Sequence, residues 1–260
     1  MDSLFIIKIG GNIIDDPTRL ESFLQQFAAV KGNKILVHGG GKLATKLAEQ
    51  MGIQQQMIDG RRITDAETLK IVTMVYAGYV NKNIVAQLQS MGQNAIGVTG
   101  ADANIIAAHQ RNHPTIDYGF VGDIDTVETT TIHQLLQQNM AIVIAPITHN
   151  GKGQLLNTNA DTIAQEIAKA MSHLYATTLI YSFEKKGVLK DINNENDVIP
   201  IIDTKLYQQL KDEQAIFAGM IPKLDNAFVA VRSGVEKVII GQAELLHALI
   251  DGTEGTSIQE

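Results

Sequence analysis

The sequence contains no cysteine among its 260 residues, which excludes disulfide bonds, thiolate zinc sites and cysteine nucleophiles. Positive charge is also scarce. Lysine and arginine total 21 against 28 aspartate and glutamate residues, and no basic run offers a nucleic-acid surface. No apolar run approaches the ~20 residues of a membrane-spanning helix. Residues 1–4 lack the basic start of a signal peptide. We therefore expect a cytoplasmic protein without nucleic-acid or membrane partners.

Motifs of several common enzyme classes are missing as well. The sequence has no Gly-x4-Gly-Lys-Ser/Thr, no Gly-x-Gly-x-x-Gly and no Gly-x-Ser-x-Gly, which argues against P-loop, dinucleotide-binding and α/β-hydrolase chemistry. The seven histidines show no His-Glu-x-x-His spacing. We therefore predict that no side chain serves as a metal ligand.

The chain does contain apolar strands that alternate with amphipathic helices along almost its whole length. This alternation is typical of an α/β fold, and we expect a three-layer αβα sandwich around a mostly parallel sheet. A soft boundary near 172–175 suggests two lobes, 1–174 and 175–260, that share one continuous sheet. The expected strands are 4–9, 34–37, 53–58, 94–98, 105–108, 116–124, 141–145, 177–181, 198–201, 237–240 and 256–258. The expected helices are 16–30, 42–51, 65–91, 129–138, 159–171, 204–211, 222–233 and 243–250.

The first strand carries a lysine in an otherwise apolar run, and two glycines follow it. Burying an ammonium group is costly unless it meets an anion, and glycines let the backbone approach that anion closely. Lys8, Gly10 and Gly11 therefore predict an anion site, with phosphate as the leading candidate. The alternative is an ordinary turn with Lys8 extended into solvent.

A second glycine run, 39–41, follows the strand at 34–37 and opens a helix. Its backbone N–H groups and the helix N-terminus together favour an anion. If the two strands are neighbours, both glycine loops face one crevice, because ligands of such sheets bind at the carboxyl ends of the strands. Two such loops and a lysine favour phosphoryl transfer over a redox cofactor.

Three further clusters place polar side chains at helix starts. Arg61 and Arg62 precede the long helix, and an arginine there is suited to bind a carboxylate. Residues 157–161 carry more polar groups than helix capping alone requires. Lys223 lies in a first helical turn, where its charge opposes the helix dipole unless an anion is bound. In each case the alternative is a solvated side chain or a simple cap.

The expected helix 65–91 is apolar on more than one face, which is unusual for a surface helix. Either it is central in the monomer or its second apolar face packs on another subunit. We favour a homodimer built on this helix, because an exposed stripe of this size would favour aggregation.

Taken in order, these stretches resemble the amino acid kinase family, and within it the branch that phosphorylates N-acylated glutamate. The Lys-x-Gly-Gly start is shared by the wider family, whereas Gly-x-Arg-x-Thr-Asp and Asn-x-Asn-Ala-Asp are typical of that branch. The matching stretches span essentially the whole chain: IKIGG at 7–11, VHGGG at 37–41, GRRITD at 60–65, GFVG at 119–122, LNTNAD at 156–161, GVL at 187–189 and GMIPK at 219–223.

The resemblance implies ATP-dependent phosphorylation of the side-chain carboxylate of N-acetyl-L-glutamate, an early step of arginine biosynthesis. It implies that Lys8 and Lys223 neutralise charge on the transferring phosphoryl group and that Asp161 holds both lysines. Mg²⁺ would be held mainly by the phosphates. The substrate would contact Gly40, Gly41, Arg62 and Asn157. ATP would contact Gly10, Gly11, Phe183, Glu184, Gly187, Phe217 and Met220.

Two stretches depart from the family pattern. Residues 183–187 read Phe-Glu-Lys-Lys-Gly where relatives often carry Thr/Ser-Asp-Val-Pro/Ser-Gly, and Ala218 stands where a glycine or polar residue is usual. The first strand begins by Leu4, without the N-terminal helix of arginine-inhibited relatives, so we expect no arginine feedback. Two alternatives stay open: N-succinyl-L-glutamate as the substrate, and a non-catalytic nucleotide or amino-acid sensor on this fold.

Overall fold

An eight-stranded sheet forms the centre of the computed structural model, which describes residues 1–58, 61–191, 194, 196–213, 216 and 220–260. The strand order is β12-β14-β13-β11-β1-β2-β8-β5, and every neighbouring pair is parallel except β13 and β14. Strands from both sides of the boundary expected near residue 174 belong to this sheet. Their bounds are β1 Ser3–Ile9, β2 Asn33–His38, β5 Ala95–Val98, β8 Ala141–Ile144, β11 Ala176–Phe183, β12 Ile201–Ile202, β13 Lys237–Gln242 and β14 Thr256–Ile258.

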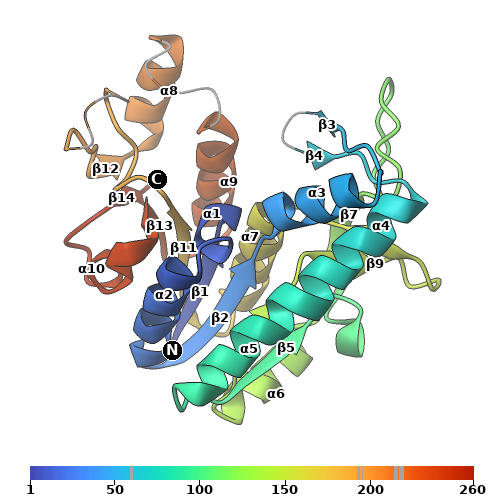
Figure 1. The fold of residues 1–260 in the computed structure, drawn as a ribbon. Coiled ribbons are helices and arrows are strands. Elements are labelled where there is room, and N and C mark those ends of the chain that lie inside the picture. Colours follow the sequence, from blue (N-terminus) through green and yellow to red (C-terminus); the bar gives the residue numbers. More distant parts are fainter. Residues whose placement is uncertain (59–60, 192–193, 195, 214–215, 217–219) are drawn as a thin grey trace.

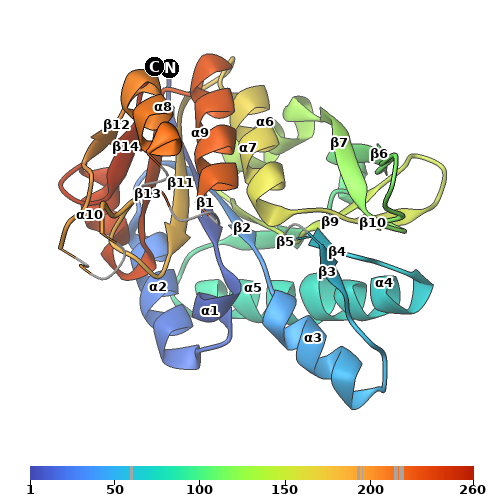
Figure 2. The same cartoon turned by 90° about the horizontal axis from the view of Figure 1, so that it is seen from above.

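Helices cover both faces of the sheet, as Figures 1 and 2 show, so the expected three-layer α/β architecture is confirmed. One face is covered by α6 (Thr129–Gln137), α7 (Ala160–Met171), α8 (Thr204–Asp212) and α9 (Ile221–Arg232). The other is covered by α1 (Gly11–Ile14), α2 (Pro17–Ala29), α3 (Gly41–Gln50), α4 (Ala66–Thr73) and α5 (Asn81–Ser90). The short α10 (Leu246–Ile250) packs against β13 and lies near α2. Among the described residues, no helix combines the length and the hydropathy needed to cross a bilayer.

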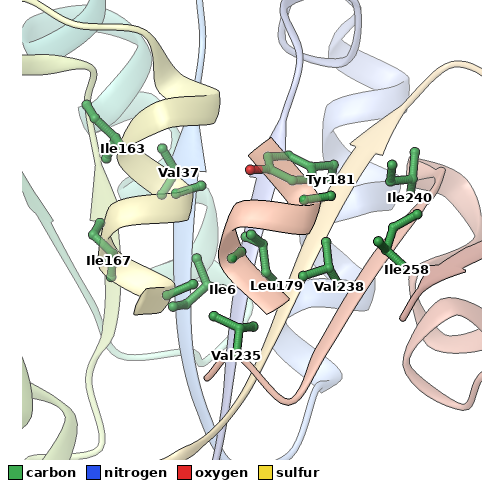
Figure 3. Close-up of a cluster of buried hydrophobic side chains, with 14 of the residues drawn as sticks. Ile6, Val37, Ile163, Ile167, Leu179, Tyr181, Val235, Val238, Ile240 and Ile258 are labelled. Atoms are coloured by element: carbon green, nitrogen blue, oxygen red, sulfur yellow. The ribbon is translucent and has the colours of Figure 1, made fainter. Parts of the chain in front are cut away.

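The period-2 alternation of strand side chains divides the core into two clusters. On β1, Leu4 and Ile6 point toward α7 and α9, and Figure 3 shows Ile6 between Ile167 of α7 and Leu179 of β11. Ile7 and Ile9 point to the opposite face, toward α2. Lys8 therefore shares the face of Leu4 and Ile6, which directs it toward α7.

A second sheet of four strands, in the order β10-β9-β6-β7, extends beyond the central one. Its strands are β6 Ile106–Gln110, β7 Gly122–Val127, β9 Ile147–His149 and β10 Leu155–Asn157. A tight turn connects the antiparallel strands β9 and β10, and in it Gly151 and Gly153 have φ of 69° and 91°. A small hairpin, β3 (Met57–Ile58) with β4 (Arg61–Arg62), carries both arginines of the site.

The expected long helix is confirmed from Ala66 to Ser90, with one difference. Its central turns, Met74–Val80, are a π-helix between α4 and α5. Most of its apolar side chains are buried within the monomer. Met74 and Tyr79 remain 52% and 65% exposed, which leaves an apolar surface on this helix.

Three strand predictions were partly wrong. The strand expected at 53–58 is limited to β3, because Gln55 turns its side chain to Thr68 and Arg62 rather than extending a ladder. The segment 116–124 becomes a strand only at Gly122, after a turn in which the Asp117 carboxylate accepts a hydrogen bond from Gly119 N. The strand expected at 198–201 is β12, Ile201–Ile202. It follows Pro200, which lacks an N–H for a ladder, and Val198 forms only an isolated bridge to Leu189.

Candidate active site

The three charged residues singled out as catalytic meet at the carboxyl edge of the central sheet. Asp161 lies in the first turn of α7, where a carboxylate is favoured by the helix dipole, and Asn159 caps that helix through its side chain. Lys8 Nζ lies 2.7 Å from Asp161 Oδ1. Lys223 Nζ, from the first turn of α9, donates to Asp161 Oδ2 at 3.0 Å. One carboxylate thus bridges two ammonium groups from separate parts of the chain.

The electrostatics of this triad, Lys8, Asp161 and Lys223, keep the carboxylate charged. Burial alone would raise the pKa of Asp161, but the two neighbouring lysines outweigh burial and hold the pKa well below its usual range. Burial lowers the pKa of Lys8, Asp161 raises it, and Lys223 lowers it again. The side chains of Lys8, Asp161 and Lys223 are 13%, 17% and 25% exposed. The triad therefore carries a net positive charge at a partly open position.

The two glycine loops lie side by side, as expected if their strands are neighbours. β1 and β2 pair in parallel, and Gly39 N donates to Ile9 O at 3.2 Å. A Cβ placed on Gly11 would lie 4.0 Å from Gly41 N. Gly40 precedes α3 as its N-cap with φ of 146°, a conformation that favours glycine. Because the first amides of a helix have no partner within it, the start of α3 supplies N–H donors to this crevice.

Arg62 and Asn157 line a cavity of about 180 Å³ together with Gly40, Gly41 and Tyr76. The Arg62 guanidinium donates to Gly41 O and Thr45 Oγ1, both at 2.9 Å, and to Gln55 Oε1. It is 6% exposed, so it is held in one position before any ligand binds. The hairpin that carries Arg62 is fixed to the start of α3 by these contacts.

A hydrogen-bond chain connects this hairpin to the end of β10. Asn157 Nδ2 donates to Thr64 Oγ1 at 3.0 Å, and Thr64 Oγ1 donates to Arg62 O at 2.8 Å. Thr64 O also accepts from Phe120 N. A Cβ on Gly119 would lie 2.3 Å from Thr64 O, so this close approach requires glycine. Arg62 and Asn157, the two residues expected to contact the substrate, are therefore linked through one buried threonine.

The residues expected to contact ATP divide into two groups. Gly10, Gly11, Phe183 and Glu184 line one cavity of about 310 Å³, which Gly41 and Lys42 also line. Gly187 instead packs beside Val198 and Thr256, where an added Cβ would lie 2.6 Å and 2.7 Å from their side chains. Met220 is the N-cap of α9 and packs against the core near α7. Phe217 and Ala218 lie outside the described residues.

Two residues of the site were not anticipated from the sequence. Tyr76 contacts Gly40, and Thr64 joins Arg62 to Asn157. A polar or aromatic side chain inside an apolar run was the available signal for Tyr76. The only sequence signal for Thr64 was its position close to Arg61 and Arg62.

Two other features bear on where the site lies. A cavity of about 850 Å³ is lined by Asp2, Ser3 and Lys34 at the amino ends of β1 and β2, the opposite edge of the sheet from the triad. Asp123 lies 2.7 Å from Arg111, the residue after strand β6, and Asp125 lies 2.6 Å from His109 of β6. These aspartates thus complete cross-strand pairs rather than facing the triad.

Comparison with known proteins gives similarities over the full length. The model of the amino acid kinase family matches residues 3–242. The chain is 56% identical over 261 residues to the acetylglutamate kinase of Cytophaga hutchinsonii, with 99% of each chain covered. It is 52% identical over 259 residues to the acetylglutamate kinase of Bacteroides fragilis, covering 100% of this chain and 98% of that one.

Among solved structures, the fold is similar to that of an N-acetylglutamate synthase from Neisseria gonorrhoeae, with a TM-score of 0.82 at 19% identity. The match covers 100% of this chain and 59% of that one. At this identity the likeness concerns the fold alone.

Proposed function

Because the chain belongs to the amino acid kinase family, we propose that it transfers the γ-phosphoryl group of ATP to the side-chain carboxylate of N-acetyl-L-glutamate. The observation that carries this proposal is the bridging of Lys8 and Lys223 by Asp161, beside two adjacent glycine loops. Phosphoryl transfer needs positive charge and fixed N–H donors around the moving group, and this edge of the sheet offers both.

The residues present fit ATP and Mg²⁺. The cavity of about 310 Å³ adjoins the glycine loops, and Lys42 adds a positive charge to its lining. Within the described ranges, no group of three or more histidine or acidic side chains is arranged to hold a metal. Mg²⁺ would be held mainly by phosphate oxygens of the bound nucleotide. When bound, ATP supplies the phosphoryl group and Mg²⁺ offsets part of its charge.

The side chains perform the remaining work by position and charge. The acceptor carboxylate is already a nucleophile, so no general base is required. Asp161 aligns the two lysines, and their ammonium groups neutralise charge that builds up on the transferring phosphoryl group. The amides of Gly11, Gly40 and Gly41 orient the reacting oxygens. Catalysis thus rests on preorganised electrostatics.

Acceptor recognition is assigned to Arg62 and Asn157. Arg62 brings a fixed positive charge to the small cavity, suited to the substrate's free carboxylate, and Asn157 faces its acylated amide end. The N-succinyl and sensor alternatives are not favoured, because the relatives described above carry the name acetylglutamate kinase. A complete triad also argues against a sensor.

A hydroxamate assay tests the proposal, because hydroxylamine traps acyl phosphates. The wild-type protein is incubated with ATP, Mg²⁺ and one of N-acetyl-L-glutamate, N-succinyl-L-glutamate or L-glutamate. We expect product with N-acetyl-L-glutamate, and its loss in Lys8→Ala but not in the matched control Lys237→Ala, whose lysine is exposed on β13. Absence of product with every acceptor, or full activity of Lys8→Ala, would refute the proposal.

We further propose that residues 1–174 bind the acylated amino acid, that residues 175–260 bind ATP, and that the protein acts in the cytoplasm. The exposed Met74 and Tyr79 support a homodimer through the long helix. Sedimentation analysis should give about twice the chain mass of 28.3 kDa, and a Met74→Lys/Tyr79→Lys variant should be monomeric. A hexamer would contradict this proposal.

A further inference from the structure

The glycine run 39–41 is held by the long helix at the place where that helix adopts π geometry. A Cβ on Gly40 would lie 3.0 Å from Cδ1 of Tyr76 and 3.6 Å from Cγ2 of Val80. Tyr76 is 5% exposed, and its hydroxyl interacts with the Arg62 guanidinium. One aromatic side chain therefore contacts both the phosphoryl loop and the substrate arginine.

Asn81, the first residue of α5, holds the same loop through a histidine. Its Nδ2 lies 3.0 Å from Val143 O and 3.2 Å from His38 Nε2, while its Oδ1 accepts from Lys82 Nζ at 3.1 Å. A carbonyl oxygen can only accept and an ammonium group can only donate, so these two neighbours fix the orientation of the amide. Asn81 Nδ2 is thus the donor toward the ring, and His38 Nε2 is the acceptor.

The hydrogen-bonding of His38 follows from this arrangement. Burial lowers the pKa of His38 to about 4, so the ring is neutral at pH 7. With Nε2 accepting, the proton lies on Nδ1, which donates to Gly39 O at 2.8 Å. In a planar trans peptide the C=O and the following N–H point in opposite directions. The His38 bond therefore fixes the direction of the Gly40 N–H.

The π segment brings the two contacts onto one face of the helix. Tyr76 and Asn81 are five residues apart, which in an α-helix would separate them by about 140° around the axis. Here Asn81 N donates to Tyr76 O, the i to i+5 bond of a π-helix, which stacks these residues. On the far side, Gly97 of β5 admits Asn81, because a Cβ there would lie 2.0 Å from its Oδ1.

We propose that Tyr76 and Asn81 are positioning residues for phosphoryl transfer, aligned by the π segment so that together they fix Gly40 and its N–H. The inference rests on the proposed function, because that function assigns the glycine run to bind the transferring phosphoryl group. Neither side chain belongs to the triad: Asn81 acts on the loop through His38, and Tyr76 acts on it through its contact with Gly40.

The test substitutes the amide donor by an isosteric acceptor. In Asn81→Asp the carboxylate cannot donate to His38 Nε2, so the ring must place a proton there. ¹⁵N NMR of labelled histidine should therefore report Nε2 protonation, in contrast to the Nδ1-protonated ring of the wild type. We expect kcat to fall about 10²-fold with the KM for ATP within about threefold, since a misplaced group costs on this order. Asn83→Asp, on the same helix, is the control, and it should change neither the protonation of the His38 ring nor kcat.

A second pair of variants keeps the inference testable if Asn81→Asp fails to fold. Tyr76→Phe keeps a ring against Gly40 and should retain more than a third of the wild-type kcat, whereas Tyr76→Leu should lose at least tenfold. Unchanged kcat in Tyr76→Leu, or an Nδ1-protonated ring with wild-type kcat in Asn81→Asp, would overturn the inference. Failure of the proposed function is distinguishable, because the wild type would then form no hydroxamate while the NMR signals still report the His38 bond.

Discussion

Replacing Asp161 by asparagine tests the triad with almost no change of shape. The variant keeps the side-chain volume and the helix start, but it removes the charge that faces Lys8 Nζ at 2.7 Å and Lys223 Nζ at 3.0 Å. Two ammonium groups would then face each other without a counterion. We expect them to move apart and to lose their alignment on the phosphoryl group.

The size of the effect follows from the burial of the pair. Breaking a buried ion pair costs about 3–5 kcal/mol. The side chains here are 13% to 25% exposed, which favours the lower end, about 3 kcal/mol. If that energy acts on the transition state, turnover falls about 10²-fold.

The pH dependence of kcat provides a second, independent test of the triad. Lys8 must be protonated to neutralise phosphoryl charge, so activity is lost as pH rises through its pKa. Burial already lowers that pKa, and Asp161 is the carboxylate that raises it. In Asp161→Asn the alkaline limb of the kcat profile should therefore shift to lower pH.

The assay is ADP release coupled to NADH oxidation, between pH 6 and 10. The control is Asp203→Asn, which removes an equal charge from the cap of α8, a place where asparagine also caps. A kcat within threefold of the wild type and an unmoved alkaline limb in Asp161→Asn would refute the reasoning.

Two further predictions concern the supports of the site, and a third concerns a buried lysine at the opposite edge of the sheet. Gly40→Ala should destabilise the fold by about 1–3 kcal/mol, because its φ of 146° strains a side chain and the new Cβ meets the Tyr76 ring. In urea unfolding, Gly40→Ala should lower the unfolding free energy more than Gly52→Ala does, because Gly52 has a φ of 73° with open space around it. Equal losses in the two variants would contradict the ring contact. Arg62→Lys should raise the KM for N-acetyl-L-glutamate about 10- to 100-fold, since it loses charged hydrogen bonds, with the KM for ATP unchanged; an equal rise in both would contradict the assignment. Burial lowers the pKa of Lys34 to about 8 from 10.5, so the unfolded chain binds more protons between these values. The unfolding free energy of the wild type relative to Lys34→Met should therefore rise by about 3 kcal/mol from pH 8 to pH 10.5, and a flat difference would contradict it.

Much of the fold and the triad could be predicted from local patterns. The strands that flank Gly10 and Gly39 are β-branched and bounded by turn residues, so their existence followed from composition. Lys8 stood out because an ammonium group within a buried strand requires a counterion. Its partner, Asp161, was placed by resemblance to a family rather than by spacing.

The supports of the glycine run could not be predicted, because they depend on distant contacts. Asn81 binds His38, 43 residues earlier, and Asn157 binds Thr64, 93 residues earlier. A π-helix inserted into an apolar helix barely alters the hydrophobic pattern, so its presence at Tyr76 left no local sign. The limited extent of β3 likewise reflects the Gln55 contacts with Thr68 and Arg62.

The most direct test of phosphoryl transfer to an acylated glutamate is ³¹P NMR of the wild-type protein with ATP, Mg²⁺ and N-acetyl-L-glutamate. We predict that ADP and an acyl phosphate appear together in equal amounts, and that neither forms when L-glutamate replaces the acylated substrate. ADP accompanied only by inorganic phosphate from the start, or equal turnover of both acceptors, would contradict the account.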